Sequence, residues 1–436
     1  MNFDKLFALA KQEGIEDVQV YYAAGTEFEI EVFNTTLEKY TIADTASLRV
    51  KGIYDGKMGT VSTEEINEDI FPFLVDSVVA SAKAITSEDE VFIYEGDKEY
   101  KELDYLYNKS LDDVSAADKI NDTLKLEELI KAQDKRISMV QAFYGDGANV
   151  VRIENSKGLK LRKEVNSAML GAFIIATDGT DQRSVFEYKL SNDYADFNLE
   201  EMAKEGAEKA VALLGSSPVK SGTYEILLKN TASCSLLAPH VSMFSAESVQ
   251  KDVSLLKGKV GEVIGSDLIT LVDDPFMLKS SRSGAFDDEG VATRYKELIQ
   301  DGKLTGFLHN LKTAKKDNTE STGNGFNAIR PTNFYFKAGE LDYDDAVKSM
   351  KKGLIITALD GTHAGCSPIS GDFSLQASGF LVEDGEIVRP VNLITIAGNY
   401  LTLLQDVTAV CSDLKFNYGF VGSPSLLIKS LQVSGE

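Results

Sequence analysis

Several residue types are scarce in this chain of 436 residues. It has no tryptophan, three cysteines and three histidines. So few cysteines, odd in number, argue against a disulfide framework and favour a reducing compartment. No apolar run approaches the roughly 20 residues that span a bilayer, and the N-terminal residues lack the basic start and long apolar core of a signal peptide. These absences predict a cytoplasmic protein with no membrane segment.

Basic residues are also in short supply relative to acidic ones. The chain carries 45 Lys and Arg against 68 Asp and Glu, a formal net charge of −23. Nucleic-acid backbones are bound through clustered Lys and Arg. The densest basic stretch, residues 312–316, holds three lysines and is interpreted as a solvated loop. The charge balance therefore predicts no direct contact with nucleic acid.

The length is too great for one small core, and at roughly 100–200 residues per domain it predicts two or three domains. The Gly-Ser-Ser-Pro stretch at 215–218 breaks the chain. We place the main boundary there, between an N-terminal α+β domain at 1–216 and a β-rich C-terminal domain at 217–436. An acidic stretch at 87–110 is a candidate linker that splits the first domain.

Hydrophobic periodicity alternates between helical spacing and strand alternation. Helices are expected at 3–13, 71–86, 199–214 and about 231–245, and strands at 224–228 and 262–272, among others. Asp-Gly pairs suit the positive φ angles of tight turns. They predict turns at Asp55-Gly56, Asp146-Gly147, Asp178-Gly179, Asp301-Gly302 and Asp384-Gly385. The pattern favours an α+β fold, with an N-terminal mixed helix and meander region followed by a β-rich C-terminal domain.

The histidines limit the metal chemistry that is available. A zincin helix needs His-Glu-x-x-His, because two imidazoles must reach the metal from one helical face. His240 is followed by Val241, and His309 has no second histidine nearby. His363 and Cys366 are close in sequence and could share a soft metal, but a site needs three or four ligands. A site built from His240, His363 and Cys366 through folding is the alternative left open.

Polar, glycine-rich loops of the second half are the other candidates. Asp273-Asp274-Pro275 offers paired carboxylates or a plain turn. The loop at 321–327 superficially suggests a phosphate cradle but lacks the Gly-Lys-Ser/Thr ending of a P-loop. Asp372 and Ser374 could form a metal-free hydrolytic pair, although a turn leading into a strand is the simpler interpretation.

The second half resembles the TldD/PmbA metallopeptidase family over nearly all of residues 222–436. The resemblance rests on a Gly-Lys-x-Gly-Glu element, an Asp-Asp-Pro, an Asp-Glu-Gly-x-x-Thr segment, a Ser-Thr-Gly-Asn loop and three C-terminal motifs. In this sequence these are residues 257–262, 273–275, 286–293, 321–325, 371–374, 396–399 and 422–428.

The resemblance implies a cytoplasmic peptidase in which TldD-type and PmbA-type (TldE) subunits act together. Such enzymes degrade unfolded peptides and trim leaders in microcin maturation, and the family also carries the label modulator of DNA gyrase. The catalytic TldD-type subunit is expected to hold zinc through His-Glu-x-x-x-His on the first helix of its C-terminal domain, with a cysteine near its C-terminus. Here that helix offers only His240, and Phe416-Asn417-Tyr418-Gly419-Phe420 contains no cysteine.

These departures predict a PmbA/TldE-like, non-catalytic subunit that binds no cofactor itself, with zinc held by a TldD-type partner. The expected partners are that subunit or a second copy of this chain, together with an unstructured peptide. The glycine-rich loops would let a peptide or partner backbone approach. The expected groove residues are Ser321, Thr322, Gly323, Gly325, Gly371 and Asp372. The alternatives are a self-sufficient peptidase with an atypical site and a non-enzymatic interaction protein such as a gyrase modulator.

Overall fold

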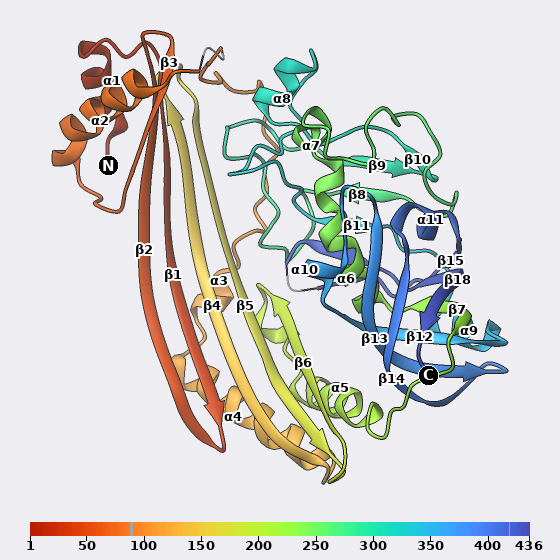
Figure 1. The fold of residues 1–436 in the computed structure, drawn as a ribbon. Helices are drawn as coiled ribbons and strands as arrows, with labels where there is room; N and C mark the ends of the chain where they lie inside the picture. Colours follow the sequence, from red (N-terminus) through yellow and green to blue (C-terminus); the bar gives the residue numbers. More distant parts are fainter. Residues whose placement is uncertain (88–89, 418) are drawn as a thin grey trace.

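The N-terminal half is built on one long, six-stranded antiparallel sheet in the order β3-β2-β1-β4-β5-β6 (Figure 1). The computed structural model describes residues 1–87, 90–417 and 419–436. The strands are β1 (Val18–Phe33), β2 (Thr36–Tyr54), β3 (Lys57–Thr63), β4 (Ile137–Asn155), β5 (Lys160–Thr177) and β6 (Gln182–Ser191). The helices are α1 (Phe3–Gln12), η1 (Glu68–Ile70), α2 (Phe71–Ala84), α3 (Lys109–Asp112), α4 (Ala116–Gln133), η2 (Tyr194–Asp196) and α5 (Leu199–Ala212).

This sheet contains the same element order twice. A helix, three antiparallel strands and a second helix appear first as α1-β1-β2-β3-α2 and again as α4-β4-β5-β6-α5. The two copies join where β1 pairs with β4. The helices of each copy pack on their own end of the sheet, so two separate hydrophobic clusters form. Between them, over the middle of the sheet, a cavity of about 680 Å³ is lined by residues of β1, β2, β4 and β5 and by residues of α3 and its flanks.

The Asp-Gly pairs divide into true turns and one exception. Asp55 and Gly56 adopt φ angles of 49° and 67° and join β2 to β3, as predicted. The turn predicted at Asp146-Gly147 is wrong, because both residues lie inside β4. Asp146 is paired with a neighbouring strand on each side. The absence of a Cβ at Gly147 suits this position, since a Cβ would lie 2.7 Å from the Thr26 carbonyl oxygen. Pairing on both edges overrides the local turn preference.

The predicted linker is an extended strap, residues 90–108, that lies against both halves of the molecule (Figure 1). Asn155 of β4 donates to the Tyr94 carbonyl at 2.6 Å. On the other side the Tyr100 hydroxyl donates to the Gly290 carbonyl at 2.7 Å, and the Tyr105 hydroxyl donates to the Phe276 carbonyl at 2.7 Å. The strap therefore ties the long sheet to the C-terminal half.

The C-terminal half contains two further six-stranded sheets, in the orders β10-β9-β8-β11-β17-β16 and β14-β13-β12-β7-β18-β15. An added pairing of β14 with β18 closes five strands of the second sheet into a small barrel. The strands are β7 (Gly222–Leu228), β8 (Leu271–Asp273), β9 (Lys296–Gln300), β10 (Lys303–Leu304), β11 (Phe334–Phe336), β12 (Lys352–Asp360), β13 (Asp372–Glu383), β14 (Glu386–Asn399), β15 (Val407–Val410), β16 (Lys415–Phe416), β17 (Val421–Ser423) and β18 (Leu426–Ser434). The helices are α6 (Asn230–Leu237), η3 (Ala238–Phe244), α7 (Ala246–Gln250), α8 (Leu311–Lys316), α9 (Tyr343–Ser349), α10 (Thr362–Gly365) and α11 (Tyr400–Gln405). This confirms the predicted α+β class with a β-rich C-terminal region.

The strand predicted at 262–272 is mostly wrong, because only β8 at its end is strand. The preceding residues form turns against β10 and α11, with Gly265 and Ile264 donating to the Gly302 carbonyl. The hairpins at Asp301-Gly302 and Asp384-Gly385 are confirmed. The helix predicted at 231–245 is α6 followed by the 3₁₀ helix η3, whose start contains Pro239, a residue that cannot supply an α-helical hydrogen bond.

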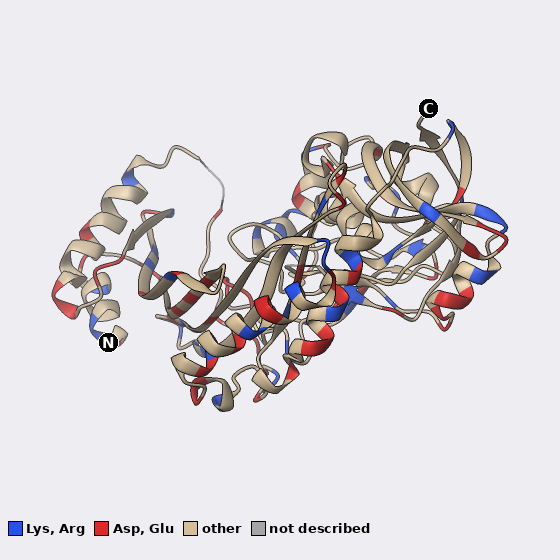
Figure 2. Cartoon of the chain, turned by 90° about the horizontal axis from the view of Figure 1, so that it is seen from below, with Lys and Arg blue, Asp and Glu red and all other residues tan. Residues whose placement is uncertain are grey.

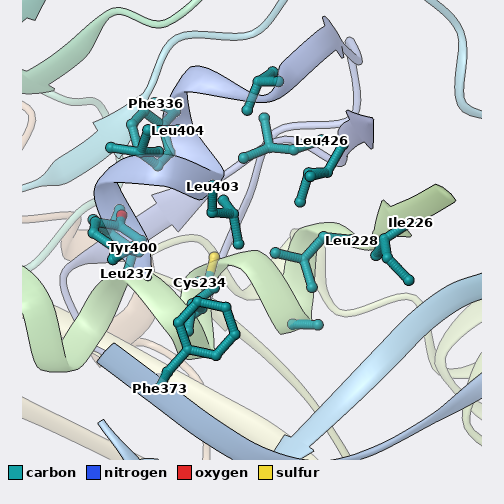
Figure 3. Close-up of a cluster of buried hydrophobic side chains, with 14 of the residues drawn as sticks. Ile226, Leu228, Cys234, Leu237, Phe336, Phe373, Tyr400, Leu403, Leu404 and Leu426 are labelled. Atoms are coloured by element: carbon teal, nitrogen blue, oxygen red, sulfur yellow. The ribbon is translucent and has the colours of Figure 1, made fainter. Parts of the chain in front are cut away.

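The largest hydrophobic core lies in the C-terminal half and surrounds α6. Figure 3 shows Cys234 and Leu237 of this helix among side chains from β7, β11, β13, α11 and β18. Each such aliphatic or aromatic side chain contributes about 1.5–3 kcal/mol when fully buried. The position of α6 inside this core fixes the surroundings of the 3₁₀ turn that follows it.

The surface carries interspersed acidic and basic positions along the helices and loops of both halves (Figure 2). None of the helices in residues 1–87, 90–417 and 419–436 combines the length and apolar character needed to cross a bilayer.

Candidate functional site

Three of the motif-bearing loops meet in one buried polar network beside β8. We call them the signature loops: residues 273–275, 286–293 and 321–327. Asn324 of the third loop donates to Asp273 of the first at 2.7 Å, and the Gly325 amide donates to Asp287 of the second at 2.7 Å. Segments up to about fifty residues apart in sequence are thus held together by one bond between side chains and one from a backbone amide to a side chain.

Asp273 is the centre of this network and is fully buried. Its Oδ1 accepts from the Thr332 amide at 2.7 Å and the Thr332 hydroxyl at 2.6 Å. Its Oδ2 accepts from Asn324 and, at 2.8 Å, from the ammonium of Lys296. Burial lowers the pKa of Lys296, and attraction to Asp273 opposes that effect. Removing one partner of such a buried pair typically lowers the free energy of unfolding by about 3–5 kcal/mol. The folded arrangement of these loops therefore depends on both Asp273 and Lys296.

Asp274, its neighbour, has a different role. It is half-buried, and its Oδ1 accepts from the Phe276 amide at 2.9 Å, which closes a side-chain turn. The two carboxylates of the Asp-Asp-Pro motif therefore do not share one ligand site. The turn interpretation fits Asp274, whereas Asp273 is an ion-paired buried group.

Asp287 and Glu289 form the acidic part of the second signature loop. Asp287 accepts from the amides of Glu289 at 2.9 Å and Val291 at 3.0 Å, as well as from Gly325. Burial raises its pKa to about 7, the negative charge of Glu289 adds to the rise, and the backbone donors oppose it. Burial likewise raises the pKa of Glu289, which accepts from the Leu311 amide at 2.8 Å. Asp287 is therefore a described acid of this network that can change charge near neutral pH.

The predicted groove residues of the third loop face other parts of the same chain. Ser321, Gly323 and Gly325 are buried, and Thr322 is half-buried. A Cβ at Gly323 would lie 2.5 Å from the Ala292 carbonyl oxygen, and one at Gly325 would lie 2.2 Å from the Glu289 carboxylate. Here the glycines allow the third signature loop to pack against the second. The groove role of these residues stays a prediction.

Gly371, Asp372 and Ser374 lie at the start of β13, apart from the signature loops. Gly371 has φ of 80° and is buried, while Asp372 and Ser374 are exposed. Asn399 donates to the Asp372 carboxylate at 3.0 Å, and bonds from Asn399 and Ser370 lower the Asp372 pKa. No hydrogen bond joins Asp372 to Ser374 among the described residues. A low-pKa carboxylate oriented by Asn399 is a weak general base.

His240 is a buried core histidine in η3. Its Nδ1 lies 2.8 Å from the Leu236 carbonyl oxygen, so Nδ1 carries the proton that is donated. Its ring stacks on Tyr400 with centroids 4.0 Å apart and planes 5° apart. Burial lowers the His240 pKa, and the bond to Leu236 opposes part of that effect. The remaining Nε2 and the Tyr400 hydroxyl have no partner among the described residues.

The remaining metal candidates do not assemble around His240. His363 is exposed in α10, and Cys366 is half-buried at its end. Nowhere in the part of the chain that the structure describes do three or more His, Cys, Asp or Glu side chains gather as a metal site. Zinc needs three or four such ligands. The described residues therefore form no site that fits the zinc that the family resemblance implies for the catalytic subunit. Tyr418, in the loop where catalytic relatives are expected to carry a cysteine, lies outside the described residues.

Comparison with known families gives the class of the protein. Three family descriptions match in chain order: PmbA/TldA metallopeptidase domain 1 at residues 18–86, the central domain at 109–214 and the C-terminal domain at 221–435. The fold is thus that of a PmbA/TldA-class metallopeptidase chain. The protein belongs to the PmbA/TldD metallopeptidase family, which confirms the resemblance seen in the sequence.

Individual relatives cover most or all of the chain. The metalloprotease PmbA of Escherichia coli O157:H7 is 29% identical over 328 residues, 74% of this chain and 71% of that protein. A solved structure of a candidate modulator of a DNA gyrase from Thermotoga maritima MSB8 has 38% identity and a TM-score of 0.93, covering 99% of both chains. TldE from Thermococcus kodakarensis, at 24% identity and a TM-score of 0.91 over 99% and 100% of the two chains, shows the shared fold.

Sequence reasoning missed the ion pair of Asp273 with Lys296 and the acidic pair of Asp287 with Glu289. The first pair is 23 residues apart, and its partners come from different strands. The available signal was a lysine and an aspartate at the ends of two short apolar runs. That signal does not specify which strands become neighbours.

Proposed function

We propose that this chain is the PmbA/TldE-type subunit of a two-component metalloprotease and that it does not itself hold the catalytic zinc. In this proposal a TldD-type subunit supplies the metal, and the present chain contributes the wall and the alignment surface for an extended peptide. A second copy of the chain takes the partner's place when that subunit is absent.

The observation that carries the proposal is the state of His240. This histidine stands on the helical segment where catalytic relatives are expected to carry His-Glu-x-x-x-His. It has no glutamate beside it and no second histidine five residues on. Its Nδ1 bonds to Leu236 and its ring stacks on Tyr400 inside the core. These contacts support a packing role for His240 in a chain that keeps the remaining motifs of the family.

The experiment compares metal content and peptide hydrolysis for the purified chain, a TldD-type chain from the same organism, and their mixture. We expect no stoichiometric zinc and no turnover of an unstructured peptide by this chain alone, and both in the mixture. The variant His240→Phe keeps an aromatic stack on Tyr400, and it should leave metal content and turnover of the mixture unchanged. The variant Cys366→Ser should do the same.

Two results would contradict the proposal. One zinc per chain with turnover by the chain alone, lost in His240→Phe, would establish a self-sufficient peptidase. Stable capture of DNA gyrase by the chain, with no effect on a TldD-type subunit, would favour a non-enzymatic interaction protein.

A further inference from the structure

One strand of the long sheet has no partner along much of its outer side, and we call residues 36–46 of β2 the free edge. β2 pairs with β1 on its inner side, but on its outer side β3 reaches only from Leu48 to Tyr54. Beyond that short strand, β2 forms the margin of the sheet (Figure 1). Among the described residues, no backbone hydrogen bond from a segment other than β1 reaches the free edge. Its outward N–H and C=O groups are therefore open to another strand.

The second copy of the repeated unit shows what this chain does with the equivalent edge. There β6 pairs with β5 from Ala168 to Thr177 and leaves residues 160–167 of β5 without a strand on that side. The strap covers part of this stretch. The Asn166 amide donates to the Leu106 carbonyl at 3.3 Å, and the Asn108 amide donates to the Asn166 side chain at 2.8 Å. The first copy has no such cover for its free edge among the described residues.

The free edge also exposes large apolar side chains. Ile42 is 64% exposed, Tyr40 is 49% exposed and Leu37 is 39% exposed. They pair with Phe28, Ile30 and Val32 of β1, three buried side chains that share one face of the sheet, so all three point to that face. Apolar side chains gathered along an unpaired strand are typical of a surface that another chain covers.

The features that normally keep an edge strand from pairing are scarce here. Proteins protect such edges with proline, with free lysines or with bulges. Residues 36–46 contain no proline. Their one lysine, Lys39, is already paired with Glu29 at 2.7 Å and Glu31 at 3.6 Å. The register with β1 is unbroken from Lys39 onwards, because the one shift lies between Glu31 and Val32. The free edge is thus a regular strand that suits strand addition.

The side chains of the free edge complement a second copy of themselves. A two-fold axis pairs two identical strands antiparallel. With the axis at Ile42, that residue lies opposite its own copy, and Tyr40 lies diagonally across from it on the same face, an aromatic and β-branched contact. Tyr40 then stands opposite Asp44, whose carboxylate can accept from the phenol hydroxyl. Lys39 stands opposite Thr45, so no like charges meet in this register.

Neighbouring registers are less favourable. With the axis at Thr41, Glu38 of each copy would lie directly opposite Asp44 of the other, which places like charges together twice. With the axis at Ala43, Ile42 would lie opposite Asp44 instead of an apolar side chain.

We propose that the free edge is the surface through which two copies of this chain associate, by antiparallel pairing of β2 with β2 about a two-fold axis at Ile42. The two long sheets then form one continuous sheet across the dimer. The inference rests on the proposed self-association of this chain and names the surface that carries it.

The first test is the oligomeric state of the purified full-length chain over a concentration series, measured by light scattering after size exclusion. We expect dimers of the wild type. Ile42→Lys places two ammonium groups opposite one another at the axis and should raise the dimer dissociation constant at least about tenfold. Ile387→Lys is the matched control, because Ile387 is 52% exposed on β14, in a different sheet. This variant should keep the wild-type constant.

The second test examines the register with introduced cysteines. It uses a Cys366→Ser background, because Cys366 is half-buried whereas Cys234 and Cys411 are buried. Ile42→Cys should give a disulfide-linked dimer on mild oxidation, since Cβ atoms directly opposite in antiparallel strands are about 4.5–5.5 Å apart, close to what a disulfide spans. Thr45→Cys is also exposed and should stay unlinked, because its own copy would lie roughly 20 Å away along the strands.

Three results would overturn the proposal. A wild-type chain that stays monomeric throughout would do so, and weaker binding of an unstructured peptide by Ile42→Lys would then assign the free edge to a peptide. Dimers that survive Ile42→Lys would place the interface elsewhere. Cross-linking through Thr45→Cys but not Ile42→Cys would exclude the axis at Ile42. None of these results bears on the proposed subunit role, which is decided by zinc content and turnover of the mixture with a TldD-type chain.

Discussion

Asp287 is a carboxyl group held in a position where ionisation is costly. It is 1% exposed and lies beside Glu289, and its pKa of about 7 stands well above the ordinary value of 3.8. The folded protein therefore binds a proton at this side chain between pH 4 and 7 that the unfolded chain releases. By linkage, this group favours the folded state most at low pH, and that advantage is lost as pH rises towards 7.

We expect Asp287→Asn to remove this component of the pH dependence. The free energy of unfolding of the wild type, relative to the variant, should fall by on the order of 4 kcal/mol between pH 4 and pH 7.5. Urea unfolding of both proteins across that range measures the difference. A constant difference between them would show that Asp287 is ionised throughout and that its three backbone donors outweigh burial.

At the scale of elements, glycine at a contact decides how closely a helix can approach a strand. Gly59 of β3 lies under α2, and a Cβ there would stand 1.9 Å from the Val78 carbonyl oxygen. The helix cannot keep its present distance from the strand if any side chain is added. The cluster formed by α1, α2 and the first strands depends on that distance.

Gly59→Ala should therefore destabilise the protein by about 1–3 kcal/mol or more, as overpacking of a close contact does. Thermal unfolding followed by circular dichroism measures the loss. Gly306→Ala is the control, because a Cβ at Gly306 meets no atom within 4 Å and its φ is not in the left-handed region. This control should change stability by less than about 1 kcal/mol. Similar effects of the two substitutions would contradict the steric account.

At the scale of the whole molecule, the strap is the element that joins the two halves. Its Tyr100 hydroxyl accepts from the Asp97 amide and donates to Gly290, and Asp97 accepts from the Ala292 amide at 2.7 Å. The Lys101 ammonium lies 3.9 Å from the centroid of the Phe276 ring. The bonds to Gly290 and Ala292 and the contact with Phe276 cross to a signature loop or to the segment directly after one, so the strap and the loops stabilise one another.

Tyr100→Phe/Tyr105→Phe should loosen the strap by removing both hydroxyl contacts to the C-terminal half. Each lost hydrogen bond should lower the stability by about 1 kcal/mol. We therefore expect faster protease cleavage between residues 90 and 108 and a lower Tm. Limited proteolysis with mass analysis of the fragments measures the site. Tyr107→Phe is the control, because among the described residues the Tyr107 hydroxyl bonds to nearby Asp112 and makes no hydrogen bond to the C-terminal half. This variant should be cleaved at the wild-type rate. Unchanged cleavage in the double variant would show that packing alone holds the strap.

The sequence by itself determined the α+β class, most helix positions and the Asp-Gly hairpins at Asp55, Asp301 and Asp384, because periodicity and turn chemistry act over a few neighbouring residues. It also carried the motifs that identify the family. Only the tertiary structure decided that Asp146-Gly147 lies inside a strand, since that depends on partners on both sides. The same holds for the Asp273 network, whose residues come from separate segments of the chain. Such assemblies depend on which strands and loops become neighbours, and local residue preferences do not encode that choice.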